Sequence, residues 1–190
     1  MASPWEINNY KTSGFVNLPE GHHERLKEAF LKWYADEKAR LLMLDENGQN
    51  WVDRLPACPK KLECRQRTTF FGENDCSCKL SEAEEKDWEM AGLLKMYLIV
   101  RHYHEGAEYE LRTRTPENYG GSGTQCVYDK CGNLISKIPG AGSADFSSPN
   151  KSAWIHFFDD VIPYDWACEL DRRSATSQYV KMYYEVRPVK

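Results

Sequence analysis

Cys126, His156 and Asp160 could together perform nucleophilic hydrolysis. They follow one another in the chain order of a Cys-His-Asp hydrolase. In such a site an imidazole makes a thiolate nucleophilic, and a carboxylate, here Asp160 or its neighbour Asp159, orients the ring. The alternative for Cys126 is half of a disulfide or a buried thiol. Cys126 lies on a predicted strand and not at a helix N-terminus, where the pKa of a thiol falls.

His156 and the two aspartates that follow it could also work as an acid–base pair without the thiol. The structural alternative is that His156 packs beside Trp154 and Phe157 while an aspartate caps the next turn. Asp145 ends the glycine-rich loop 140–145, where its carboxylate could close an Asx turn or take part in a site. His156 is therefore the first of these residues to substitute, and Asp145 the second.

Metal and phosphate sites have less support. His102 and His104 stand two positions apart and could ligate a metal, but no cysteine or carboxylate has a companion spacing. A structural turn is the better interpretation of this pair. The glycines of 120–123 precede a strand, and no Lys-Ser or Lys-Thr follows them, which argues against a phosphate cradle. The sequence predicts no metal ion and no cofactor.

The seven cysteines are the most unusual part of the composition. They are Cys58, Cys64, Cys76, Cys78, Cys126, Cys131 and Cys168. The spacings within 58–78 do not match the paired C-x2-C motifs of a common zinc ribbon. One or two disulfides, a zinc site and free thiols all stay open. The disulfide candidates are all of the cysteines except Cys131.

The elements that must position these residues predict an α+β fold. They are an amphipathic helix over 22–45, loops and short strands over 51–80, a helix from a capping box at 81–84 to about residue 100, a strand over 109–115, a hairpin over 125–135 and a C-terminal helix over 168–186. The second helix is expected to bury Trp88, Leu94, Tyr97 and Leu98. We expect a single domain with helices packed on a small antiparallel sheet.

Length and charge limit the function further. The chain has 190 residues and a formal net charge of −4, so no basic surface indicates nucleic acid as a partner. No apolar run approaches the length of a membrane span, and the first six residues do not resemble a secretory signal peptide. We expect an N-terminal helical portion, 1–50, and an α+β portion, 51–190, to form one compact unit.

Five short motifs in a fixed order resemble the AMOP domain, an adhesion-associated extracellular module of a mucin and related surface proteins. They are YHEGA at 103–107 followed by Arg112, GSGTQCVYD at 121–129, LI at 134–135, GSAD at 142–145 and DVIPY at 160–164 before Cys168. Cys58 and Pro59 match the start of the family pattern. The resemblance covers roughly residues 51–170.

Three departures from the family pattern concern its disulfides and its first motif. Val127 stands where the family has a second cysteine, and Glu105 stands where it has a proline. Cys168 stands alone where the family tends to have two cysteines. The family's disulfide set therefore does not carry over complete, and the alignable cysteines are Cys58, Cys126 and Cys168.

The resemblance implies an interaction module that binds a protein of a host or neighbouring cell. His104, Arg112, Tyr128 and Asp145 are its candidate binding residues. Similar motifs in bacterial proteins of unassigned activity imply an exported effector, secreted without a signal peptide (for example by type VI secretion) or extracellular, and acting as a monomer. A small Cys-His-Asp hydrolase toxin is the alternative. A cytoplasmic partner-binding protein with free thiols is the third hypothesis.

Overall fold

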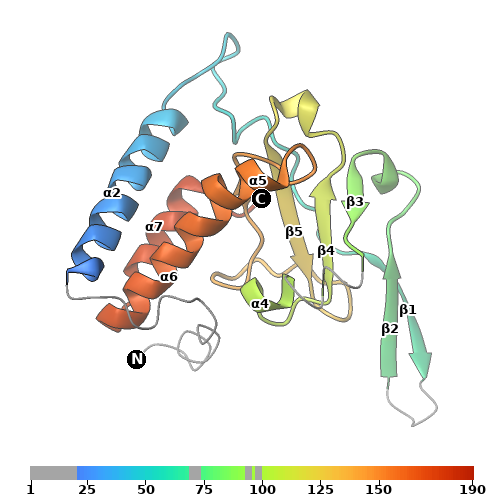
Figure 1. The fold of residues 1–190 in the computed structure, drawn as a ribbon. Coiled ribbons are helices and arrows are strands. Elements are labelled where there is room, and N and C mark those ends of the chain that lie inside the picture. Colours follow the sequence, from blue (N-terminus) through green and yellow to red (C-terminus); the bar gives the residue numbers. More distant parts are fainter. Residues whose placement is uncertain (1–20, 69–73, 93–95, 97–99) are drawn as a thin grey trace.

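The molecule has a helical end and a sheet end (Figure 1). The computed structural model describes residues 21–68, 74–92, 96 and 100–190. Its helices are α2 (His22–Leu41), α4 (Arg101–Tyr103), α5 (Ala153–His156), α6 (Ile162–Ser174) and α7 (Gln178–Val186). Its strands are β1 (Glu63–Thr68), β2 (Asn74–Lys79), β3 (Trp88–Met90), β4 (Tyr109–Thr113), β5 (Gly123–Tyr128) and β6 (Ala144–Asp145). Short helical turns are η1 (Glu84–Lys86), η3 (Pro116–Tyr119) and the π-helical η4 (Phe157–Val161).

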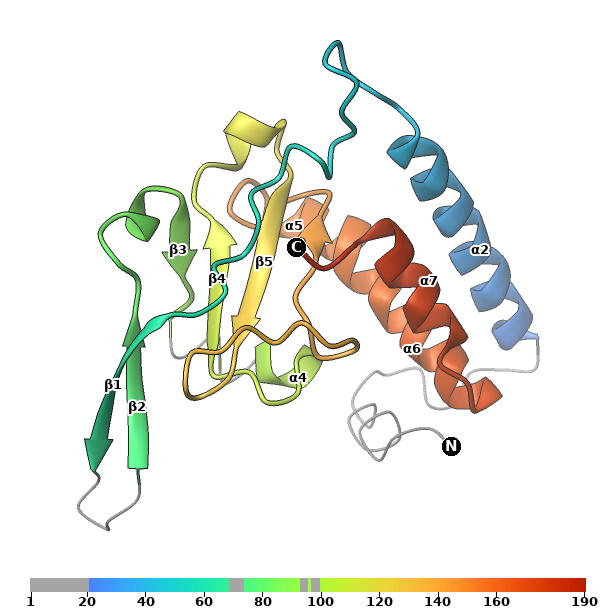
Figure 2. The same ribbon diagram turned by 180° about the vertical axis from the view of Figure 1, so that it is seen from behind.

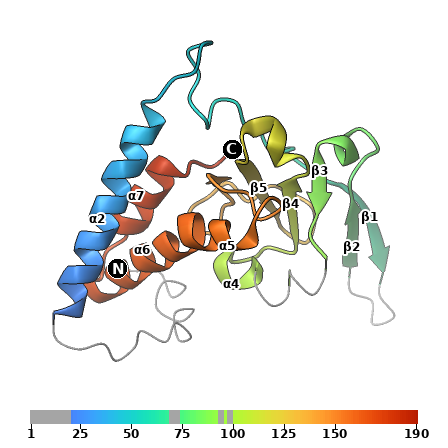
Figure 3. The ribbon, with the colours of Figure 1, turned by 45° about the horizontal axis from the view of Figure 1, so that its top comes forward.

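In space, the helices and the two sheets are arranged from one end of the molecule to the other (Figures 1, 2 and 3). Helix α2 forms one end and packs against α6 and α7. The antiparallel sheet β3-β4-β5-β6 comes next, and the hairpin of β1 and β2 forms the other end. The chain is therefore one α+β domain with helices packed on a small antiparallel sheet, as the sequence predicts. A boundary at residue 50 stays a prediction.

Helix α2 confirms the amphipathic pattern but ends earlier than expected. Leu26 and Phe30, four residues apart on one face, are buried against the C-terminal helices. The helix ends at Leu41 because the Asp45 carboxylate accepts hydrogen bonds from the Asn47 and Gln49 amides and closes a turn there. Asp45 therefore belongs to a turn and not to the predicted helix.

The predicted helix over 81–100 is wrong. Its capping box does form, because Ser81 N–H donates to the Glu84 carboxylate and Glu84 N–H donates back to the Ser81 hydroxyl. Only the turn η1 follows, and the chain then enters β3, where Trp88 pairs with Thr113 of β4. Trp88 is buried as expected. Leu94, Tyr97 and Leu98 lie outside the described residues.

The C-terminal helix is two helices. Ala175 adopts a left-handed conformation with φ 50° and ends α6. The Asp171 carboxylate then accepts hydrogen bonds from the Thr176 hydroxyl and from the amides of Tyr179 and Val180. Asp171 thus satisfies the orphan amides at the start of α7. This turn folds α7 back beside α6, so both helices can face α2.

The strand over 109–115 is confirmed as β4, and the predicted hairpin is confirmed in its first strand, β5. Leu111 of β4 is paired with Cys126 of β5, and Arg112 with Gln125. The second strand of the hairpin is reduced to a single bridge between Tyr128 and Leu134. Every residue of β5 is buried, so this strand forms the centre of the sheet.

The two largest apolar cores of the described residues lie in different parts of the molecule. We call residues 58–145 the sheet half, whose core includes Leu62, Trp88 and Leu111. We call α2 together with residues 153–187 the helix half, whose core includes Phe30 and Leu170. No helix within the described residues is long and apolar enough to cross a membrane.

Candidate functional site

A cavity of about 460 Å³ lies where the sheet half meets the helix half. Five of the seven candidate catalytic and binding residues line it, namely His104, Arg112, Asp145, His156 and Asp160. The cavity wall is otherwise largely aromatic and includes Tyr164, Tyr183 and Tyr184. A volume of this size is typical of a small-molecule or side-chain pocket.

Arg112 occupies the sheet-side wall between two carboxylates. Its Nε donates to Glu110 Oε1 at 2.6 Å, and its Nη1 donates to Asp145 Oδ2. The Gln125 amide also donates to Glu110 Oε1, at 2.8 Å. All four side chains come from β4, β5 and β6, because the strand register places Arg112 opposite Gln125. We call Glu110, Arg112 and Asp145 the sheet-side network.

A second arginine holds the helix-side wall in a similar way. Arg187 follows α7, is fully buried, and donates from Nε to Asp160 Oδ1 at 2.6 Å and from Nη1 to Glu37 Oε2 at 2.7 Å. The guanidinium carbon also lies 5.3 Å from the ring centroids of both Trp33 and Trp51. Glu37, Arg187 and Asp160 form the helix-side network, which ties α2 and α7 to η4.

His156 joins the two networks. Its Nδ1 lies 3.3 Å from Asp160 Oδ2 and 3.9 Å from Asp145 Oδ2. Nδ1 also lies 3.0 Å from the Ser147 carbonyl oxygen. Because both close neighbours of Nδ1 accept hydrogen bonds, Nδ1 carries a proton and donates it. In the neutral ring, Nε2 therefore keeps the lone pair.

The two aspartates beside His156 have opposite pKa directions. Burial, opposed by Arg112, raises the pKa of the Asp145 carboxyl, and the nearby Asp160 charge adds to the increase. Burial acts on Asp160 too, but Arg187 and the hydrogen bond from His156 outweigh it and lower the pKa of that carboxyl. The amides of Phe146 and Ser147 also donate to Asp160. Asp160 is the carboxylate that stays ionised.

His104 lines the cavity as a neutral imidazole. Burial lowers its pKa to about 4. Its Nδ1 lies 3.2 Å from the Gly140 carbonyl oxygen and 3.0 Å from that of Ala141, so Nδ1 is a donor here as well. The nearby Gly142 permits this path of the loop, because a Cβ there would lie 2.3 Å from the Gln125 carbonyl oxygen. His102 is exposed, whereas His104 is buried.

Asp145, His156 and Asp160 bring three possible metal ligands within 4.8 Å of one another. The hydrogen bonds argue against a metal at this point. Nδ1 of His156 carries a proton directed at oxygen acceptors, and both Asp160 oxygens already accept hydrogen bonds. The three residues therefore form a proton-bearing network, and the position left for chemistry is Nε2 of His156.

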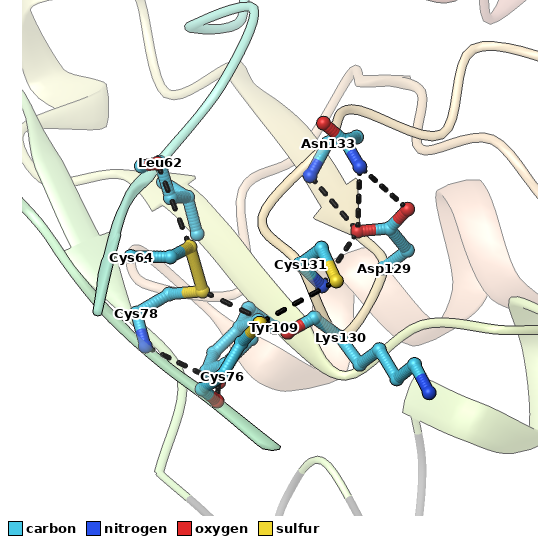
Figure 4. Close-up of a disulfide and its surroundings, with 9 residues drawn as sticks. All are labelled: Leu62, Cys64, Cys76, Cys78, Tyr109, Asp129, Lys130, Cys131 and Asn133. Carbon is cyan, nitrogen blue, oxygen red and sulfur yellow. Dashed lines mark hydrogen bonds between the residues drawn. A yellow bond between two sulfur atoms is a disulfide. The ribbon is translucent and has the colours of Figure 1, made fainter. Parts of the chain in front are cut away.

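Cys126 offers no thiol to this cavity. It forms a disulfide with Cys58, and its side chain is fully buried. The hypothesis of a Cys126 nucleophile beside His156 and Asp160 is therefore corrected: Cys126 braces β5, and the other two residues meet without it. A second disulfide joins Cys64 of β1 to Cys78 of β2 (Figure 4).

Cys131, which was not among the disulfide candidates, lies beside this second disulfide. Its Sγ lies 3.4 Å from Cys76 Sγ, because the Asp129 carboxylate holds the turn that carries it (Figure 4). Gly132 is required in this turn: its φ is 75°, and a Cβ there would lie 2.3 Å from Cys64 Sγ. Neither disulfide includes Cys168, which is buried in α6.

Tyr128 was a candidate binding residue but does not line the cavity. It is fully buried in the core of the sheet half, where its hydroxyl donates to the Pro59 carbonyl at 2.9 Å. Burial raises the pKa of this hydroxyl. Tyr128 thus fixes the segment that leads to the Cys58 disulfide.

An exposed apolar surface borders the cavity. Trp154, Ile155, Phe157 and Phe158 of α5 and η4 are 73%, 51%, 41% and 59% exposed, and Phe157 also lines the cavity. His156 and Asp160, four residues apart, face inward, which leaves Trp154 and Phe158 to stack on the outside with ring centroids 6.1 Å apart. We call these four residues the aromatic rim.

Sequence reasoning missed the helix-side network. Arg187 and Glu37 are 150 positions apart in the chain, and neither belongs to a motif. The only signal was Glu37 itself, an acidic residue on the apolar face of α2. A charge at such a position indicates a buried partner.

The family model of the AMOP domain matches residues 28–190 of the chain. The match includes α2 from residue 28 onward, both sheets and the C-terminal helices. No curated protein and no solved structure matches the chain.

Proposed function

Because the chain belongs to the AMOP domain family, a family of adhesion-associated extracellular modules, we propose that it binds a protein of a host or neighbouring cell through the aromatic rim. Export of the chain as an effector is part of the proposal. The disulfides Cys58–Cys126 and Cys64–Cys78 support a location outside the reducing cytoplasm.

The aromatic rim is the observation that carries this proposal. Trp154 and Phe158 present stacked rings to solvent, and large apolar side chains gathered on one surface mark interaction sites. Tryptophan and other aromatic residues also supply much of the binding energy at protein interfaces. The cavity beside the rim gives a partner side chain a place to enter.

Binding to intact cells tests the proposal. We expect fluorescently labelled chain to bind saturably to cells of a bacterial and animal panel, and the double variant Trp154→Ser/Phe158→Ser to bind at least about tenfold more weakly. Because both side chains are exposed, this variant should keep its fold. Treatment of the cells with protease should abolish binding, since the partner is a protein.

The matched control is Leu42→Ser/Leu44→Ser. These two leucines follow α2 and are also exposed, so the control removes apolar surface away from the cavity. It should bind like the wild type. Equal weakening in both variants would indicate nonspecific adhesion and contradict the proposal. Binding that survives protease treatment of the cells would contradict a protein partner.

A further inference from the structure

The arrangement around His156 is that of a general base. Nδ1 donates toward Asp160 and the Ser147 carbonyl, so the neutral ring has its lone pair on Nε2. A carboxylate on the far nitrogen of an imidazole fixes its tautomer and stabilises the charged ring that forms during proton transfer. The ring lines the cavity, which is where a reacting water would have to lie.

Asp160 is suited to be the positioning residue of this pair. It is fully buried, it accepts hydrogen bonds from Arg187, Phe146 and Ser147, and its pKa is lowered. The four-residue spacing across α5 and η4 places it behind the ring. Asp160 therefore holds His156 without giving up its own charge.

Arg112 supplies a cation to the same cavity. Its bonds to Glu110 and Asp145 use Nε and Nη1, which leaves Nη2 as a remaining donor of a side chain that lines the cavity. A guanidinium held in place by two carboxylates can stabilise a developing oxyanion.

The cavity also selects a class of substrate. Of the two networks, the carboxylates of Asp145 and Asp160 line the cavity against the single cation of Arg112, so an anionic substrate is disfavoured. The rings of Tyr103, Phe157 and Tyr164 line the wall and favour an apolar group. A neutral ester with a small acyl or aryl group fits both conditions.

We propose that the cavity is a hydrolytic site for small neutral esters in which His156 is the general base for a water molecule. The water oxygen bonds to the ester carbonyl carbon while its proton passes to Nε2 of His156. The carbonyl electron pair moves onto the oxygen facing Arg112. When this pair returns, the bond to the leaving oxygen breaks, and His156 gives its proton to that oxygen. The products are one carboxylic acid and one alcohol.

Hydrolysis of p-nitrophenyl acetate and p-nitrophenyl butyrate by the full oxidised chain tests this activity. We expect many turnovers per molecule for the wild type and a rate at least about 100-fold lower for His156→Ala. The control is His23→Gln, which removes an imidazole from α2, outside the cavity, and should leave the rate unchanged. A wild type without turnover, or an active His156→Ala, overturns the proposal.

A second measurement keeps the test valid if His156→Ala does not fold. Diethyl pyrocarbonate acylates unprotonated imidazole nitrogens, and peptide mass spectrometry locates the modified residues. In the wild type, loss of esterase activity should follow acylation of His156. Loss of activity with His156 unmodified would overturn the proposal.

The role of Asp160 has its own readout. In Asp160→Asn the proton of the neutral His156 ring should redistribute toward Nε2, which nitrogen-15 NMR reports, and the rate should fall with it. An unchanged tautomer would contradict the positioning role. This proposal does not depend on the aromatic rim, so cell binding and ester hydrolysis can fail separately.

Discussion

In the sheet half, the disulfides Cys58–Cys126 and Cys64–Cys78 join the strands and their approach segment covalently. In the helix half, α2, α6 and α7 are joined by ring contacts, such as Phe30 with Tyr179, and by buried Arg187. The two walls of the cavity are therefore stabilised by different interactions. A reductant should weaken the sheet-side wall, and loss of the Arg187 cation should weaken the helix-side wall.

The two arginine networks differ in the same sense. Each places one guanidinium between two carboxylates. Arg187 is completely buried and links segments from both ends of the described chain, whereas Arg112 lines the cavity and bonds residues of neighbouring strands. In the helix-side network Arg187 and Glu37 lie away from the cavity and only Asp160 lines it, whereas Arg112 and Asp145 of the sheet-side network both line it.

Removal of Arg187 should have the largest effect. Arg187→Met leaves the buried Asp160 without its arginine and leaves Glu37 with the part-exposed Arg40 alone, and the loss of a buried partner typically costs about 3 to 5 kcal/mol of unfolding free energy. Arg112→Met should cost less, because Asp145 can take up a proton and the cavity admits water. Urea unfolding followed by tryptophan fluorescence measures both values. An equal or larger loss of unfolding free energy in Arg112→Met would contradict this difference between the two networks.

Removal of each disulfide should have the next largest effect on the free energy of unfolding. The effect should be larger for the disulfide that closes the longer loop. Cys58 and Cys126 are 68 positions apart, and Cys64 and Cys78 are 14 apart. Chain entropy then predicts that replacing each pair with serines costs about 4 and about 3 kcal/mol, respectively. Hydrogen exchange should show the loss first in β4 and β5. Faster exchange in α6 and α7 at the same time would mean that the two halves do not differ in this way.

His104 should make the sheet half sensitive to acid. Burial lowers its pKa to about 4 in the folded state, against about 6.5 in the unfolded chain. Above pH 6.5 His104 is neutral in both the folded and the unfolded state. Between pH 6.5 and 4 only the unfolded state binds a proton, so the free energy of unfolding falls by about 3 kcal/mol across this range. His104→Asn should flatten the stability curve in this window, and His102→Asn should not. Parallel curves for the wild type and His104→Asn would contradict this prediction.

Asp165 should have the smallest effect, with the opposite sign, in the helix half. Burial raises the pKa of this α6 carboxyl to about 6. The folded state therefore loses stability as the pH rises from about 3.8 to 6, because the unfolded chain ionises first. Asp165→Asn should gain about 1 to 2 kcal/mol at pH 7 and nothing near pH 3.5. Thermal unfolding at the two pH values checks this, and a gain at both would rule out ionisation as the cause.

Local sequence patterns predicted the helices and strands that are determined by residues close together in the chain. Leu26 and Phe30 predicted the buried face of α2, and the residues 125–128 predicted most of β5. The capping box at Ser81 was equally strong, but pairing of Trp88 with Thr113 prevailed over it. Tertiary pairing of this kind cannot be read from a helix signal alone.

The candidate site was predictable in some of its members and not in its geometry. His156 and Asp160 were both candidates, and their four-residue spacing becomes a contact only because α5 and η4 form a continuous helical segment. The approach of Asp145 and Arg112 depends on strand register. Cys126 fits the chain order of a catalytic triad equally well as a nucleophile or as a disulfide partner, and only the fold places Cys58 beside it.

The sheet half and the helix half meet at His156, whose neutral ring carries its proton on Nδ1 and keeps its lone pair on Nε2. Long-range proton–nitrogen NMR of the oxidised chain, with histidine labelled and the ring neutral, tests it most directly. The account predicts a protonated Nδ1 and an unprotonated Nε2 for His156. A protonated Nε2 would contradict it, because Nδ1 could then no longer donate to Asp160.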